Sequence, residues 1–216
     1  FYGREDVAAL LDEGKVPLGL DLETVEPVTW DLKKGNLLYL TDKEEQMTQF
    51  VKQIARSKQK VIVLAPAYNE LPEMEGVTIL STKEDYVAGI KKMEENIQLR
   101  LEQQKSQHEA TIVLYNQLEL MNDLSMDLQS SLNYVLEKGA RAGYATVAMS
   151  GSQLNRKIDE VSKSIKLYKQ AIVAMRITDQ SVLNVINRPV REEALDSQVN
   201  YYVEDGFVRK VKVLMK

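Results

Sequence analysis

Short apolar runs, bounded by turn residues and separated by more polar segments, recur along most of the chain. They occupy residues 37–40, 61–65, 77–80, 111–115, 144–149 and 171–177. Continuous apolar runs of this kind are typical of strands that are buried on both faces of a mostly parallel sheet. Because helical patterns follow these runs, the sequence predicts a three-layer α/β domain with right-handed crossover connections.

Two long helices are predicted by apolar residues that recur at spacings of three and four. The first series is Tyr86, Ile90, Met93, Ile97 and Leu101. Ser81 and Glu84 precede this series and have the spacing of a capping box, which predicts the start of the helix. The second series runs over 124–136, and Gly139 is expected to end that helix as its C-cap.

Two hairpins are predicted near the ends of this pattern. The first pairs 16–20 with 27–32, and the second covers 201–213 and turns at Asp205-Gly206. Residues 1–15 are expected to be a linker with a short helix that leads in from a preceding region. Residues 16–216 are expected to form a single domain, since no internal repeat interrupts the pattern.

Composition narrows the chemistry that this domain can carry. The 216 residues are 44% hydrophobic and 28% charged, as in ordinary globular proteins, and the net charge of -4 disfavours nucleic acid as a partner. The absence of Cys excludes disulfides, thiolate metal sites and cysteine nucleophiles, and His108 is the only imidazole. The sequence starts at Phe1 and shows no recognisable signal peptide, so we expect a segment of a longer polypeptide, and we expect no metal site in it.

The opening segment 16–32, followed by the apolar run 37–40, resembles the start of an FtsK/SpoIIIE-type ATPase domain. The turn at 138–144 resembles the arginine- and glycine-rich turn of that family, and 173–179 and 202–206 resemble its closing strands. More closely, the chain resembles the C-terminal ATPase-like domain of the type VII secretion ATPases of the EssC/YukB (EccC) family. The resemblance covers nearly the whole chain. It implies a RecA-like (FtsK/HerA-type) fold with a mostly parallel central sheet and a C-terminal β-hairpin.

The resemblance places the phosphate loop of these ATPases at residues 41–48. A working loop reads Gly-x-x-x-x-Gly-Lys-Ser/Thr, in which backbone N–H groups and the lysine bind phosphates and the hydroxyl binds magnesium. Thr41 and Gln46 replace the two glycines, Met47 replaces the lysine, and only the hydroxyl of Thr48 remains. We therefore regard this as a degenerate phosphate loop and expect no bound nucleotide.

The replacements at this loop also oppose phosphate binding directly. Thr41 and Glu44 have capping-box spacing, which predicts that side chains satisfy the N–H groups that a phosphate would use. Asp42, Glu44 and Glu45 place carboxylates at the positive end of the helix dipole, and Lys43 alone offsets them. A capped helix is therefore the favoured interpretation of 41–48.

A second catalytic element is missing at the end of a later strand. Where the family carries adjacent carboxylates for magnesium and water activation, this chain has Tyr115 and Asn116. A neutral amide is a poor magnesium ligand and cannot act as a general base. Glu119 is the nearest acid, but it is displaced along the turn. We expect no catalytic residues, no ATP or magnesium cofactor and no ATP hydrolysis in this domain.

Other candidate features have two interpretations each. Arg141 is either a cation at a helix terminus, which we favour, or an arginine finger that serves a neighbouring subunit. Several methionines either fill the core or form an adaptable peptide groove. They are Met74, Met93, Met121, Met126, Met149 and Met175. His108 lies in a polar stretch and is expected to be a solvated loop residue.

The resemblance therefore implies a non-hydrolysing, ATPase-like module of a membrane-anchored secretion protein, on the cytoplasmic side of the membrane. The implied partners are the preceding ATPase domain of the same polypeptide, small helical WXG-type secreted proteins, and further copies in a homo-oligomer. A divergent NTPase that uses Thr48, Lys43 and Glu119 with ATP and magnesium remains an alternative. A DNA translocase module is a second alternative, which the acidic net charge disfavours.

Overall fold

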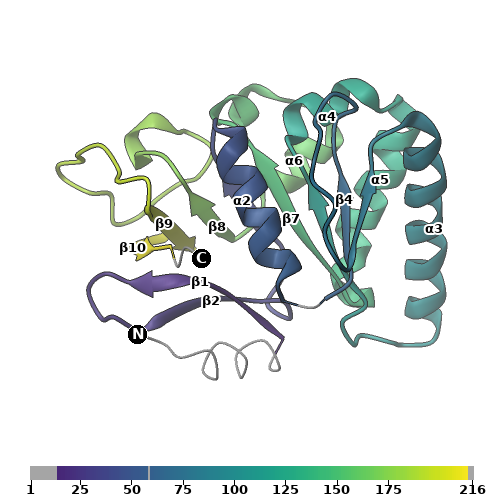
Figure 1. Ribbon diagram of the computed structural model, residues 1–216, viewed down its shortest axis with the longest axis horizontal. Coiled ribbons are helices and arrows are strands. Elements are labelled where there is room, and N and C mark those ends of the chain that lie inside the picture. Colours follow the sequence, from purple (N-terminus) through teal and green to yellow (C-terminus); the bar gives the residue numbers. More distant parts are fainter. Residues whose placement is uncertain (1–13, 58, 214–216) are drawn as a thin grey trace.

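The computed structural model describes residues 14–57 and 59–213, and their strands form one ten-stranded sheet (Figure 1). The strand order across the sheet is β2-β1-β10-β9-β8-β3-β7-β6-β4-β5. The strands are β1 Lys15–Asp21, β2 Pro27–Asp31, β3 Leu37–Leu40, β4 Val61–Leu64, β5 Val77–Leu80, β6 Ala110–Leu114, β7 Tyr144–Ser150, β8 Gln170–Val173, β9 Val199–Glu204 and β10 Phe207–Lys212.

Helices occupy the connections between the parallel strands, except the connection from β4 to β5. The α-helices are α2 Glu44–Ala55, α3 Lys83–Glu102, α4 Gln117–Asp123, α5 Met126–Gly139 and α6 Glu160–Lys166. The short 3-10 helices are η1 Ala140–Ala142, η2 Ser152–Arg156 and η3 Ile177–Asp179. Within the described ranges, none of the helices is both long and apolar enough to span a bilayer.

The centre of the sheet is parallel, as the apolar runs predicted. Strands β8, β3, β7, β6, β4 and β5 pair in parallel, with β3 between β7 and β8. The two predicted hairpins are also present: β1 pairs with β2, and β9 pairs with β10, both antiparallel. The second hairpin turns at Asp205 and Gly206, both with positive φ, which suits the right-handed twist of its strands.

Two hydrophobic layers sandwich the sheet, because successive strand residues point to opposite faces. In β3, Leu38 and Leu40 join the layer formed with α3, α4, α5 and α6. Leu37 and Tyr39 join the opposite layer, which includes the buried face of α2 and the apolar residues of β1 and β2. Figure 1 shows α2 crossing one face of the sheet, with α3 and α5 adjacent to each other at one end. The three-layer α/β prediction is confirmed.

Two predicted helix boundaries are wrong by a few residues. The N-cap of α3 is Thr82, and its capping box pairs Thr82 with Asp85, not Ser81 with Glu84. Gly139 is the last helical residue of α5, with φ of −59°, and the C-cap is Ala140 instead. The chain continues through η1, and Gly143, with φ of 87°, terminates it in the left-handed conformation.

Two further expectations concern where strands begin and end. The predicted run 171–177 forms a strand only as far as Val173, and η3 follows from Ile177. The expected linker and helix over 1–15 fall mostly on residues 1–13, which lie outside the described residues. Lys15 already belongs to β1, so the first hairpin begins one residue earlier than predicted.

The turn at Gly143 is the backbone position where an added methyl group has the least room. A Cβ at Gly143 would lie 2.0 Å from the Gln107 carbonyl oxygen, whereas a Cβ at Gly35, also at positive φ, would meet nothing within 4 Å. We expect Gly143→Ala to lower the free energy of unfolding by about 2–4 kcal/mol through steric clash and φ strain. Gly35→Ala should lower it by about 1 kcal/mol, through strain alone. Urea denaturation of both variants tests this, and equal losses would contradict it.

Candidate functional site

Three residues, Thr41, Asp42 and Lys43, connect the carboxyl end of β3 to the start of α2. Thr41 is fully buried, and its N–H donates to the Ser150 carbonyl at 2.9 Å, which continues the β3–β7 pairing. The Thr41 hydroxyl accepts the Lys43 N–H at 3.1 Å and donates to the side-chain oxygen of Gln46. The turn is therefore closed by side-chain and backbone groups of the chain itself.

The helix occupies most of the positions that align with a phosphate loop. A phosphate loop needs an open arch of backbone before its helix, so that several N–H groups can converge on the ligand. Here α2 begins at Glu44, so residues 44–48 of the aligned segment 41–48 are already helical. Met47, at the lysine position, is only 3% exposed and packs in the same apolar layer as Phe50.

The capping box predicted for Thr41 and Glu44 is wrong. The N-cap of α2 is Lys43, whose side chain makes no capping bond. Thr41 bonds to the Lys43 N–H instead of to the third residue of the helix, because the helix begins later than the box requires. Glu44 and Glu45 do lie in the first turn of α2, as predicted, where their charge favours the helix dipole.

The Glu44 carboxylate is held by side-chain amides from the segments that follow two other strands. Its Oε1 accepts from the Asn116 side chain and its Oε2 accepts from the Asn69 side chain, both at 3.1 Å. The Asn116 amide also donates to the Tyr68 hydroxyl at 3.1 Å. Asn116 follows β6, whereas Tyr68 and Asn69 follow β4, so the carboxyl ends of three strands meet here.

The Tyr115 hydroxyl joins β6 to the first turn of α2. It lies 2.9 Å from the Thr48 hydroxyl and donates to the Glu44 carbonyl at 3.2 Å. Burial raises the pKa of the Tyr115 phenol, so the hydroxyl stays protonated near neutral pH and can donate. Thr48 also donates to the Glu44 carbonyl, at 3.1 Å. The Thr48 hydroxyl, the one group of the phosphate-loop pattern that this chain retains, is therefore hydrogen-bonded to other residues of the protein.

Asp42 points away from α2, toward the loop that follows β7. Its two oxygens accept the Ser152 N–H at 2.8 Å and the Ser152 hydroxyl at 2.9 Å. A Cβ at Gly151 would lie 2.5 Å from Asp42 Oδ1, so the close approach requires glycine there. Gln117 also forms hydrogen bonds with two serine hydroxyls, Ser150 at 3.0 Å and Ser162 at 2.9 Å. Gln117 and both serines are buried.

Most of the site residues named from the sequence lie at one edge of the sheet, in two hydrogen-bonded groups: Thr41 with Gln46, and Thr48 with Tyr115. Thr41, Gln46, Thr48, Tyr115 and Asn116 lie together at the carboxyl edge of the parallel strands. Glu119 is exposed on α4 and accepts only from Asn122, at 3.0 Å.

The remaining candidates lie elsewhere. Arg141 is exposed on η1, at the opposite edge of the sheet, and His108 is also exposed. Met93 and Met149 are buried core residues, whereas Met126 is exposed, so the methionines form no single groove. No cluster of three or more metal-ligating side chains occurs within the part of the chain that the structure describes.

Sequence reasoning missed Tyr68, Asn69 and Gln117. Polar residues just after buried runs are a usable signal, because the carboxyl ends of parallel strands share one edge of the sheet. Tyr68 and Asn69 follow the run 61–65, and Gln117 follows 111–115. The order of the strands in the sheet decides which of these strand ends are adjacent. The pattern of apolar runs does not specify that order.

Comparison with known proteins fits this architecture. No family model matches the sequence. The type VII secretion system protein EssC of Staphylococcus aureus (strain MRSA252) is 25% identical over 212 residues, which are 94% of this chain and 14% of that protein. The chain is related to EssC. It spans only a small part of that relative's length.

Solved structures of EssC and EccC share the fold. EssC (ATPases 2 and 3) from Geobacillus thermodenitrificans superposes with a TM-score of 0.80 and 18% identity, covering 93% of this chain and 41% of that chain. Thermomonospora curvata EccC (ATPases 2 and 3), in complex with a signal sequence peptide, gives a TM-score of 0.73 and 16% identity, covering 96% and 42%. The predicted RecA-like fold and the predicted resemblance to the C-terminal ATPase-like domain of EssC are confirmed.

Met47 offers a direct test of how this EssC-like turn is built. Because its side chain is buried, Met47→Lys would place a charge in the apolar layer and should lower the free energy of unfolding by about 3–5 kcal/mol. It should not produce phosphate release from ATP above background. Glu45→Lys, an exposed change in the same helical turn, should cost about 1 kcal/mol or less. Chemical denaturation and a phosphate-release assay check both variants; turnover in a stable Met47→Lys protein would contradict this description.

Proposed function

We propose that this EssC-like chain is a non-hydrolysing module of a type VII secretion ATPase and acts by binding protein. The observation that carries the proposal is the closed turn between β3 and α2. Thr41 and Gln46 fill its interior, and Met47 points into the core. A polyphosphate would have to displace these contacts and unwind the first turn of α2.

Electrostatics support the same proposal. Glu44 and Glu45 lie in the first turn of α2, and Asp42 lies in the turn before it, where an ATPase concentrates positive charge on the phosphates. At the end of β6, Tyr115 and Asn116 offer a protonated phenol and a neutral amide, neither of which suits magnesium. We therefore propose that ATP and magnesium are not cofactors of this domain.

The alternative of a divergent NTPase would need Thr48, Lys43 and Glu119 to cooperate. The Thr48 hydroxyl is bound to Tyr115 and to the Glu44 carbonyl. Glu119 bonds to Asn122 on its own helix and is exposed to solvent. These contacts favour the non-hydrolysing proposal, and nucleotide binding distinguishes the two.

Isothermal titration with MgATP provides that measurement. The expected result is no saturable heat at millimolar nucleotide, because the turn has no vacant N–H arch and carries negative charge. An active P-loop ATPase titrated in the same buffer serves as the control. Micromolar binding that requires magnesium would refute the non-hydrolysing proposal and revive the divergent NTPase.

A groove beside α3 is the surface that we propose for protein binding. It has a volume of about 640 Å³ and lies between α3 and the strands β4 and β5, of which β5 is the edge strand. Apolar lining comes from Ile62, Leu80 and Leu99, and charged residues surround it. An amphipathic helix can place side chains spaced by three and four residues into such a groove. The T. curvata EccC structure holds a signal sequence peptide, which supports a secretion-signal helix of a WXG-type protein as the ligand.

The cellular setting belongs to the same proposal. The related structures contain consecutive ATPase domains, and one of them is a cytoplasmic domain of EssC. We propose that this chain follows another ATPase domain in a membrane-anchored polypeptide, works on the cytoplasmic side, and influences that neighbour by contact.

Two matched residues on α3 test the groove. Leu99 and Val87 are 49% and 51% exposed, but only Leu99 lines the groove. We expect Leu99→Asp to weaken binding of a fluorescent WXG-type signal peptide by roughly 10-fold or more, since it places a charge on an apolar contact. Val87→Asp should leave affinity unchanged. Equal effects of the two changes in fluorescence anisotropy would argue against this groove.

A further inference from the structure

Among the described residues, strand β5 has a neighbour on one side only. It is the last strand of the sheet and pairs in parallel with β4. Just beyond β4, the Ala65 N–H donates to the Leu80 carbonyl at 3.0 Å, so the backbone of Leu80 faces β4. Backbone groups of successive strand residues point to opposite sides. The N–H and carbonyl of Ile79 and the carbonyl of Val77 therefore point outward, away from the sheet.

The sequence of β5 has none of the features that usually protect an edge strand. Natural edges are protected by proline, by charged side chains or by a bulge. β5 reads Val-Thr-Ile-Leu, carries no charge and pairs with β4 in unbroken register. By contrast, β2 at the opposite edge begins with Pro27 and ends with Asp31, and its pairing with β1 contains a register shift. An unprotected edge favours pairing with a further strand.

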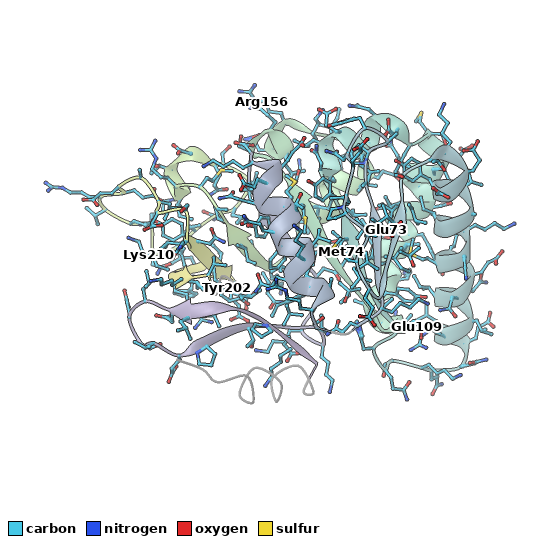
Figure 2. All side chains as sticks on the ribbon, in the orientation of Figure 1. Glu73, Met74, Glu109, Arg156, Tyr202 and Lys210 are labelled. Atoms are coloured by element: carbon cyan, nitrogen blue, oxygen red, sulfur yellow. The ribbon has the colours of Figure 1, made fainter. Side chains whose placement is uncertain are left out.

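Grooves lie on both faces of the sheet at this edge. On one face, Thr78 and Leu80 line the groove beside α3. On the other face, a groove of about 730 Å³ lies between the end of α2 and the segment that precedes β5, and Met74 lines it. In Figure 2, Met74 of this groove and Glu109 of the groove beside α3 both lie to the right of α2. Because strand side chains alternate between faces, an added strand would direct neighbouring side chains toward different grooves.

The charges in both grooves are nearly balanced, which favours an uncharged ligand. The α2-side groove carries two basic and two acidic side chains, Lys52, Arg56, Glu73 and Glu75. The groove beside α3 carries two basic and three acidic side chains, Lys60, Lys92, Asp85, Glu95 and Glu109. Lys60 and Glu109 form an ion pair at 3.8 Å. Apolar contact comes from Met74 in one groove and from Ile62 and Leu80 in the other.

We propose that the outer edge of β5 binds an extended, uncharged peptide segment of a partner protein. The segment adds a strand to the sheet: its backbone pairs with Val77 and Ile79, and its β-branched or other apolar side chains alternate between the two grooves. Such a segment needs only the width of one strand, about 4.8 Å. Figure 1 shows α3 outside the strands at this end of the molecule, so a second copy that approached edge to edge would meet α3.

A fluorescent peptide, Ser-Gly-Thr-Val-Ile-Val-Thr-Gly-Ser, tests the edge directly. We expect saturable binding to the whole chain in fluorescence anisotropy, at a concentration between micromolar and millimolar. The matched control carries methyl groups on the backbone nitrogens of its five central residues. Because methylation removes the donors that pair with an edge and keeps the side chains, it should weaken binding roughly 10-fold or more.

Two substitutions at one position separate backbone pairing from side-chain contact. Ile79→Pro removes the outward N–H and leaves the hydrogen bonds between β5 and β4, because proline is tolerated where the N–H faces away from the sheet. It should weaken peptide binding roughly 10-fold or more. Ile79→Val keeps the N–H and should bind as the unaltered chain does. Leu99→Asp lies outside this edge and should also leave binding of this peptide unchanged, so the edge is tested separately from the signal-helix groove.

Amide hydrogen exchange on the unaltered chain is independent of any folding defect in a variant. At saturating peptide, exchange of the Ile79 amide should slow roughly 10-fold or more, whereas the Leu80 amide, which already faces β4, should change little. Equal binding of the methylated peptide, an unprotected Ile79 amide, or no binding at millimolar peptide would each overturn the proposal. Binding that Leu99→Asp abolishes and Ile79→Pro does not would place the peptide in the signal-helix groove instead. Self-association of the chain that Ile79→Pro abolishes would assign the edge to a second copy instead.

Discussion

The buried hydroxyl of Thr41 is the contact on which the candidate site depends. A buried hydroxyl must be hydrogen-bonded, and this one accepts the Lys43 N–H and donates to Gln46. Those two bonds keep the link between β3 and α2 short, so the helix starts close to the end of the strand. Once the helix starts there, Met47 lies against the core and the Glu44 carbonyl comes within reach of Tyr115. The remaining contacts of the site follow from this turn.

The carboxyl edge of a parallel sheet is where α/β proteins place their ligands, because helix starts and polar loop residues converge there. In this chain the polar residues also converge at that edge, but their side chains form hydrogen bonds with one another. Glu44 bonds to Asn69 and Asn116, and Asp42 bonds to Ser152. A network whose members satisfy each other stabilises the fold. A RecA-like fold can therefore support a binding role in the absence of its usual chemistry.

If nucleotide does not drive this module, its contribution comes from its surfaces. The groove beside α3 is apolar with a charged border, and suits a helix.

The sequence by itself determined the local structure of this protein. Continuous apolar runs identified the buried strands, and Asp205-Gly206 identified the closing turn, because these signals depend only on neighbouring residues. Where two adjacent residues could both cap, as Ser81 and Thr82 can, the sequence left the choice to packing. Only the tertiary structure decided that Glu44 would meet Asn69 and Asn116. Those residues are brought together by the order of β3, β6 and β4 in the sheet, and that order depends on how whole faces pack.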